Sequence, residues 1–200
     1  MLTELRAALR PALTLLIGFT LLLGIAYPIT ITGIAGLVLP AQAGGSLVMA
    51  DGKPVGSALI GQDFTGAGYF HPRPSAAGKG YDASASSGSN LAPGSKDLAD
   101  RIAGSVQTLR DAGVTGAVPG DLVTTSGSGL DPDISPDAAA MQVARIASAR
   151  GLGAADVSAL VARLTDGPLL GMLGEPRVNV LAINRELDRI SAAKAAKPAA

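Results

Sequence analysis

The first candidate for chemistry is His71, the only histidine in the chain, which lies in the segment Phe70-His71-Pro72-Arg73-Pro74. A histidine beside a serine and a carboxylate can act as the general base of a hydrolase, and serines are frequent in the neighbouring segments. No serine, however, stands in the G-x-S-x-G turn that exposes the nucleophile of α/β-hydrolases. The sequence therefore favours a loop histidine that is hydrogen-bonded to the backbone. A membrane-anchored extracytoplasmic hydrolase that uses His71 and a loop serine stays as the alternative.

Two patterns could hold a metal ion. Zinc at His71 would need several carboxylates, because the chain has no cysteine, and no acidic residues cluster near this histidine. The segment Asp131-x-Asp133-x-Ser135-x-Asp137 resembles the start of a calcium loop, in which alternate side chains turn their oxygens toward one ion. Pro136 stands where that loop needs glycine, and Gln142 stands where it needs a bidentate glutamate. We therefore expect turns and helix caps here, and no bound metal.

Phosphate binding depends on one turn, Ser126-Gly127-Ser128-Gly129, whose backbone amides can face an anion, although the same residues also form ordinary tight turns. The chain has no G-x-x-x-x-G-K-[ST] loop for nucleotide phosphates. It also lacks the Asp-Lys-Thr-Gly segment, whose aspartate is phosphorylated in ion pumps of the P type. The chain is therefore not expected to hydrolyse ATP by itself.

A long uncharged segment precedes all of these residues. No charged residue lies between Arg10 and Asp51, and residues 12–34 supply the run of about 20 apolar residues that a bilayer-spanning helix needs. This run is longer than the apolar part of a signal peptide, although Ala41-Gln42-Ala43 resembles a cleavage site. The sequence predicts a single transmembrane helix over 12–34, with a kink at Pro28.

The basic residues predict the orientation of this span. Arg6 and Arg10 lie just before it, and the next basic residue is Lys53, beyond its far end. Because positive charge is retained on the cytoplasmic side, residues 1–11 are expected in the cytoplasm and everything after the span outside it. The 16 basic and 16 acidic residues balance and form no basic cluster, which argues against a nucleic-acid partner.

The rest of the chain is expected to form one α+β domain over residues 35–190, followed by a disordered tail at 191–200. Asp51-Gly52 predicts a hairpin turn between two strands, at 46–50 and 55–60. The segment 61–95 is rich in glycine and serine, yet it carries four of the six aromatic residues, so we expect an ordered loop. Four helices are predicted from apolar residues at helical spacing: Leu98, Ile102, Val106 and Leu109; Val143, Ile146 and Ala147; Val157, Leu160, Val161 and Leu164; Val180, Ile183, Leu187 and Ile190.

Several blocks of the sequence together resemble one family. They extend from the predicted span to the last helix and occur in this order: YP at 27–28, GSALIGQ at 56–62, YFHPRPS at 69–75, YD at 81–82, ASSGSNL at 85–91, DLVT at 121–124, SGSGLDP at 126–132, ISP at 134–136 and GEPRVNV at 174–180. In this order the chain closely resembles KdpC, the small subunit of the bacterial Kdp potassium-transporting P-type ATPase. The resemblance covers nearly the whole chain, from Pro11 to about Asp188.

The resemblance implies a non-catalytic subunit of a high-affinity, ATP-driven potassium import complex in the bacterial cytoplasmic membrane. Its partners would be a channel-like subunit that conducts potassium and a P-type subunit that hydrolyses ATP. The family's subunit is regarded as necessary for assembly and as a catalytic chaperone that raises the affinity for ATP. No firmly bound cofactor is implied, and ATP would be met only through the complex.

The resemblance also suggests roles for individual residues. The turn at 126–129 resembles the signature loop of ABC ATPases, so Ser126, Gly127, Ser128, Gly129 and Gln142 are candidate nucleotide contacts. The predicted topology places them outside the cytoplasm, where ATP is scarce, so direct ATP binding and this topology conflict. The resemblance suggests that Tyr27 and Pro28 of the span pack against partner helices. In the loop, the aromatic residues and one arginine are the further candidates for docking to partner subunits: Phe64, Tyr69, Phe70 and Arg73.

Overall fold

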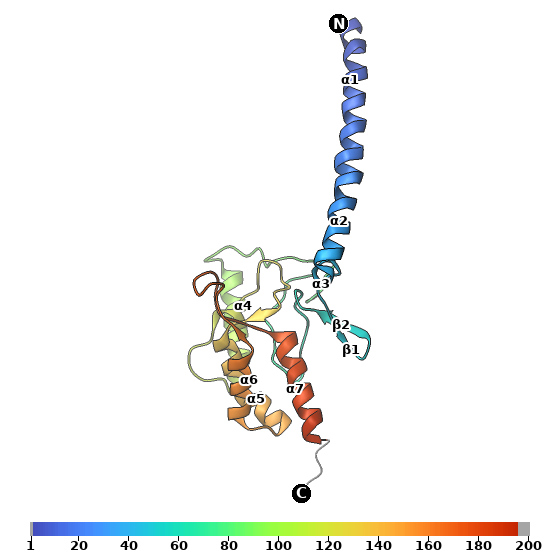
Figure 1. The fold of residues 1–200 in the computed structure, drawn as a ribbon. Coiled ribbons are helices and arrows are strands. Elements are labelled where there is room, and N and C mark those ends of the chain that lie inside the picture. Colours follow the sequence, from blue (N-terminus) through green and yellow to red (C-terminus); the bar gives the residue numbers. More distant parts are fainter. Residues whose placement is uncertain (1, 196–200) are drawn as a thin grey trace. The chain divides into compact units, whose positions relative to one another are not determined.

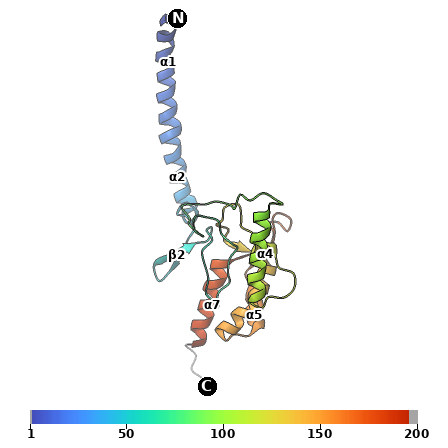
Figure 2. The same ribbon diagram turned by 180° about the vertical axis from the view of Figure 1, so that it is seen from behind.

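The computed structural model describes residues 2–195, which fall into two compact units that meet between Leu47 and Val48 and are treated separately below (Figures 1 and 2). The first unit is helical and consists of α1 (Leu2–Leu21), the π-helical turn η1 (Leu22–Ala26), α2 (Tyr27–Val38) and α3 (Pro40–Ala43). Among the described residues, one helix is long and apolar enough to cross a membrane, from Arg6 to Val38, with a mean hydropathy of 2.1. It contains the predicted span and extends it at both ends.

Pro28 explains the π-helical turn. Proline has no N–H and its ring crowds the preceding turn, so a helix that contains it must adjust locally. Here the adjustment lies directly before the proline, where the Tyr27 N–H bonds to the Leu22 carbonyl, five residues back. The hydroxyls of Thr14 and Thr30 bond to carbonyls one turn earlier, Arg10 and Ala26, at 2.9 and 2.8 Å. Polar groups of this helix are thus satisfied internally, as a bilayer requires.

The second unit is an α+β domain. Its elements are β1 (Leu47–Ala50), β2 (Lys53–Ser57), α4 (Lys96–Asp111), the 3₁₀ turn η2 (Gly120–Leu122), β3 (Asp133–Ile134), α5 (Pro136–Arg150), α6 (Ala154–Arg163), β4 (Thr165–Asp166), β5 (Arg177–Asn179) and α7 (Val180–Ala195). The fold class is the one that the sequence predicts. Helix α7 continues to Ala195, into the segment expected as a tail, and residues 196–200 lie outside the described part of the chain.

The two small sheets are antiparallel. The β1–β2 hairpin is the predicted one, and its turn residues Asp51 and Gly52 both have positive φ, at 50° and 76°. The other sheet has the order β3-β5-β4, with Ile134 and Thr165 on either side of Val178. The sequence analysis missed these three strands, because elements of two or three residues are too short to show an alternating pattern.

Local sequence signals mark the ends of three of these helices. The Ser95 hydroxyl accepts from the Leu98 N–H at the start of α4, and the Ser135 hydroxyl accepts from the Ala138 N–H at the start of α5. Helix α5 ends at Gly151, which has the left-handed φ of 60° that favours glycine. The Asn179 side chain caps α7 by accepting from the Ala182 N–H.

The core lies where α5, α6 and α7 meet the three-stranded sheet. The predicted apolar residues of three helices, α5, α6 and α7, contribute most of its side chains. Small alanines on α5 let α6 pack closely against it. Its buried residues are Phe70, Ile134, Ala138, Ala139, Val143, Ile146, Ala147, Val157, Leu160, Val161, Val178, Val180, Ile183 and Leu187. Phe70 is the one that comes from the long loop.

A candidate partner-binding groove

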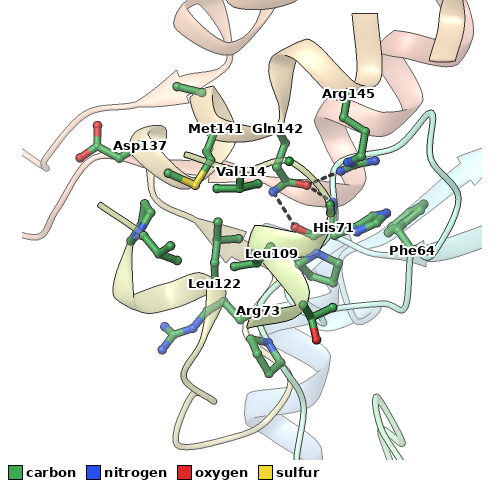
Figure 3. Close-up of a pocket in the computed structure, with 18 of the residues that line it drawn as sticks. Phe64, His71, Arg73, Leu109, Val114, Leu122, Asp137, Met141, Gln142 and Arg145 are labelled. Carbon is green, nitrogen blue, oxygen red and sulfur yellow. Dashed lines mark hydrogen bonds between the residues drawn. The ribbon is translucent and has the colours of Figure 1, made fainter. Parts of the chain in front are cut away.

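An open groove lies between the C-terminal half of α4 and the exposed side of α5, with a cavity volume of about 1130 Å³ (Figure 3). The connection from α4 to η2 closes one side, and loop residues 63–74 form another. The lining is mixed: apolar side chains form more than half of it, and polar or charged side chains form the rest. The lining side chains with the clearest roles are Phe64, His71, Arg73, Leu109, Val114, Leu122, Asp137, Met141, Gln142 and Arg145.

The apolar face of helix α4 is covered only in part. Its stripe of Leu98, Ile102, Val106 and Leu109 is only half-buried, and no residue of this helix is fully buried. The same kind of spacing on α5, α6 and α7 gives stripes that lie in the core. Leu109 instead lines the groove opposite Met141 of α5. An amphipathic helix whose apolar face is covered only in part is typical of a surface that another segment covers.

Gln142 holds the loop against the floor of this groove. Its Oε1 accepts from the His71 N–H at 2.7 Å, and its Nε2 donates to the His71 carbonyl at 3.0 Å (Figure 3). The side chain is only 7% exposed, and it also bonds to the Ala138 carbonyl and to Arg145. Gln142 therefore pairs with the loop as a neighbouring strand would, and its polar atoms are used within the domain.

Asn184 of α7 makes the same pairing one residue earlier. Its Oδ1 accepts from the Phe70 N–H at 2.7 Å, and its Nδ2 donates to the Phe70 carbonyl at 2.9 Å. Both Asn184 and Phe70 are 0% exposed. Two amide side chains from two helices thus hold consecutive loop residues, and we call Asn184 and Gln142 the amide clamp.

Two arginines fix the residues just before the clamp. Arg145 donates to the Ala67 carbonyl at 2.6 Å, and Arg150 donates to the Gly68 carbonyl. Arg150 also lies over the Tyr69 ring, 4.5 Å from its centroid, and pairs with Asp188 at 2.8 Å. Sequence reasoning overlooked Asn184, Arg145 and Arg150. The available signal for Asn184 was a polar residue beside the apolar stripe of the last helix.

His71 is half-buried, and the Nε2 of its ring lies 3.1 Å from the Gly66 carbonyl. Within the described residues, this carbonyl rather than a serine hydroxyl is its hydrogen-bond partner. Burial lowers the pKa of His71, against the opposing effect of the Gly66 carbonyl, and the charge of Arg145 lowers it further. The ring is thus neutral at pH 7 and stabilises its own loop through the hydrogen bond to Gly66, as the sequence favours.

We expect the stability of the domain to fall as the pH drops below about 6.5, the ordinary histidine pKa. The unfolded chain binds the proton more readily than the folded chain, whose His71 pKa is lowered, so acid favours unfolding. One proton limits the slope to about 1.4 kcal/mol per pH unit. The C2 proton resonance of this single histidine gives the folded pKa, and urea unfolding of the chain in micelles gives the slope. An equal slope between pH 7 and 5.5 in His71→Asn would contradict the assignment.

Two of the three aspartates in the segment that resembles a calcium loop, Asp131 and Asp133, have structural partners. Asp131 pairs with Arg73 at 2.9 Å and accepts from the Asp133 N–H. Asp133 contacts Asn179 at 3.0 Å and Arg177 at 3.3 Å, and burial raises the pKa of its carboxyl group. Among residues 2–195, no three His, Cys, Asp or Glu side chains gather in a way that would hold a metal ion.

The candidate nucleotide contacts are not brought into one site. Gln142 lies on the groove, whereas the turn at 126–129 is outside its lining and packs against the loop before α4. There the Ser87 N–H donates to the Ser128 carbonyl at 2.9 Å, and the Ser75 hydroxyl donates to the Gly129 carbonyl at 2.6 Å. A role for Ser126, Gly127, Ser128, Gly129 and Gln142 toward nucleotide stays a prediction.

The candidate docking residues separate into three groups. Phe64 and Arg73 line the groove, where a partner can reach them. Tyr69 is half-buried under Arg150, and Phe70 has no exposed surface, so its aromatic area serves the domain's own core. Tyr27 and Pro28 lie on the helix of the first unit. Docking by these residues stays a prediction, and for Phe70 a substitution would act first on folding.

Comparison with known proteins gives a consistent result. Residues 9–189 match the family model described as "KdpC: K+-transporting ATPase, c chain". A protein of Gemmatimonas aurantiaca named potassium-transporting ATPase KdpC subunit is 60% identical over 186 residues, which cover 92% of this chain and 94% of that protein. Proteins of the same name from Caulobacter vibrioides and Rhodospirillum rubrum are 58% and 55% identical, and each alignment covers 90% of this chain.

Proposed function

Because this chain belongs to the KdpC family, the c chain of the K⁺-transporting ATPase, we propose that it is a subunit needed to assemble an ATP-driven potassium import complex. Its relatives are named as subunits of that ATPase, and the chain itself is an accessory subunit. Its partners in this proposal are a channel-like potassium-conducting subunit and a P-type subunit that hydrolyses ATP. The helix at Arg6–Val38 would anchor it in the bacterial cytoplasmic membrane as a single-pass protein.

The observation that carries the assembly role is the groove beside α4. Apolar side chains of α4, of α5 and of the connection between α4 and η2 form much of its wall, Leu109 and Met141 among them. Apolar surface of this extent is costly in water unless a partner covers it. A segment of a partner subunit that inserts between Leu109 and Met141 would remove this surface from water and would meet Phe64 at the edge.

The charges of the groove specify the partner further. Arg145 is half-buried, and within the described residues its guanidinium bonds to a carbonyl and to the Gln142 side chain, with no carboxylate in ion-pair contact. Burial accordingly lowers the pKa of Arg145. Asp63 and Asp137 also line the groove, so a partner segment that presents apolar side chains, and a carboxylate only beside Arg145, would fit it best.

Leu109→Asp should reduce co-purification of the chain with the other subunits by at least about tenfold, since about 1.4 kcal/mol of lost binding free energy already gives that factor. Leu109 is outside the hydrophobic core, so the variant is expected to fold. Ala103→Asp on the exposed face of the same helix is the matched control. The measurements are subunit stoichiometry after affinity purification and potassium-stimulated ATPase activity. An intact, fully active complex with Leu109→Asp would rule out docking through the groove.

The proposal also includes the role of catalytic chaperone, in which the subunit raises the affinity of the complex for ATP. This role and the expected extracytoplasmic position of the domain are compatible only if the effect passes through the partner subunits. A cysteine introduced at Ser128, in a chain that has no other cysteine, can be labelled by impermeant reagents from either side of the membrane. Labelling from the cytoplasmic side alone would reverse the expected orientation and would bring the turn at 126–129 within reach of ATP.

A further inference from the structure

Helix α4 and the turns on either side of it make no hydrogen bond or ion pair to the rest of the domain. We call residues 92–118 the lid segment; α4 is the green helix in Figure 2. Within the described residues 2–195, every hydrogen bond and ion pair of the lid segment joins two of its own residues. The amide clamp, in contrast, ties α5 and α7 to the long loop. Only apolar contact therefore holds the lid segment in place.

This apolar contact is shallow. No residue of α4 is fully buried, and none belongs to the hydrophobic core or to the partly buried residues that pack against it. Because burial stabilises by about 25 cal/mol per Å² of apolar area, α4 is held less firmly than α5, α6 and α7, whose stripes lie in the core. Segments with few buried apolar contacts open locally, at a lower free energy than the whole domain.

The chain can turn at both ends of α4. Gly94 precedes the helix with a φ of 80°, and Gly113 follows it with a φ of 85°. At either position an added Cβ would meet no atom within 4 Å, so packing does not hold these two residues in place. Without a Cβ, glycine changes its backbone conformation more readily than other residues. Both positions can therefore absorb the change in φ and ψ that a movement of α4 requires.

From these three observations we infer that the lid segment opens and closes independently of the core, and that the partner segment in the groove closes it. The second part rests on the proposed docking through the groove, which Leu109 and Val114 of the lid segment help to line. An open lid segment does not stay helical, because a helix of 16 residues is marginal in water without a surface to pack on. A partner segment adds the missing apolar cover, so assembly stabilises α4 in its closed position.

Two substitutions distinguish independent opening from unfolding of the whole domain. Ile146 of α5 has no exposed surface, so Ile146→Val weakens the core by removing one buried methyl group. It accelerates every opening that disrupts the core, and it leaves α4 unchanged if the lid segment opens alone. Gly104 lies inside α4 on its exposed side, where an added Cβ meets no atom within 4 Å. Gly104→Ala therefore stabilises the helix itself and slows any opening that unfolds it.

The test is backbone amide hydrogen exchange of the full chain in micelles and of the assembled complex, followed helix by helix with mass spectrometry. In the free chain, the amides of α4 should exchange at least about tenfold faster than those of α5. Ile146→Val should accelerate exchange in α5, α6 and α7 by about two- to tenfold and leave α4 unchanged. Gly104→Ala should slow exchange in α4 by about two- to fivefold. In the complex, α4 should exchange at least about tenfold more slowly than in the free chain.

Each other outcome overturns a specific statement. Equal acceleration of α4 and α5 by Ile146→Val would show that the lid segment opens only with the core, and would leave docking through the groove intact. An unchanged α4 in Gly104→Ala would show exchange without loss of the helix and equally overturn independent opening. Fast exchange of α4 that stays the same in the complex would disprove closure by the partner. Leu109→Asp then decides about the groove itself, because an intact complex with this variant would reject docking there as well.

Discussion

Asn184→Ala should lower the free energy of unfolding of the domain by about 2–5 kcal/mol, because it leaves two buried backbone groups without partners, at about 1–3 kcal/mol each. Asn184 is the only described side chain that bonds both the N–H and the carbonyl of Phe70, and neither residue is exposed to water. Water therefore cannot replace the lost bonds without opening the core. The measurement is urea unfolding of the chain in micelles, followed by circular dichroism.

Two further variants separate the hydrogen bonds from other effects. Arg185→Ala, on the exposed face of the same helix, removes one surface hydrogen bond to the Met49 carbonyl and should cost less than about 1 kcal/mol. Asn184→Asp keeps the shape and the acceptor, but places a carboxylate against the Phe70 carbonyl. Its defect should shrink at acidic pH, where a protonated carboxyl can donate again. If Asn184→Ala and Arg185→Ala unfolded at the same urea concentration, the amide clamp would have no role in stability.

The regular elements could be predicted because their signals are local. Ser135 followed by Pro136 identifies the start of α5, and Asp51-Gly52 requires the positive φ values that the hairpin turn shows. The stripe that begins at Val157 is buried, as its spacing predicts. Each of these features depends on residues within about eight positions of one another.

The amide clamp could not be predicted in the same way. Phe70 and Asn184 are 114 positions apart, and nothing near either residue indicates the other. A polar residue on a helix ordinarily indicates the side that faces water, and a loop phenylalanine with few apolar neighbours indicates contact with a partner. The structure shows a different arrangement for one physical reason: the loop enters the core at Phe70, and its buried backbone needs polar partners from the helices, which Asn184 supplies.

Helix α4 differs from its sequence pattern in the opposite direction: its apolar residues are less buried than their spacing indicates. Its stripe of Leu98, Ile102, Val106 and Leu109 has the same spacing as the buried stripes, yet it stays half-exposed. Periodicity reports only that a face is apolar, and it cannot say whether the covering surface belongs to the same chain. For a subunit of a complex this difference is informative, because Leu109, the last residue of the partly buried stripe, lines the groove proposed for assembly.

A second substitution that should lower the stability of the domain strongly is at Gly129, in the turn at 126–129. Gly129→Ala should destabilise the domain by about 2–5 kcal/mol, which combines the cost of a left-handed alanine with that of overpacking. Gly129 has a φ of 67°, and an added Cβ would lie 2.4 Å from the Ser87 carbonyl oxygen and 2.8 Å from the Ala77 nitrogen. Both obstacles are backbone atoms, which cannot turn aside as a side chain can. Urea unfolding of the variant in micelles is the measurement.

Gly127→Ala is the matched control, because an added Cβ at this position meets no atom within 4 Å and φ is not in the left-handed region. It should be nearly neutral for stability, and equal losses in the two variants would contradict the conformational explanation for Gly129.

The variants of this turn also test the proposed nucleotide role. If the turn contacts ATP, Gly127→Ala or Ser128→Ala should raise the KM of the assembled complex for ATP while stability stays constant. A change in KM seen only with Gly129→Ala would instead reflect the damaged packing between the turn and Ser87, and the catalytic chaperone role would then have to act through the partner subunits.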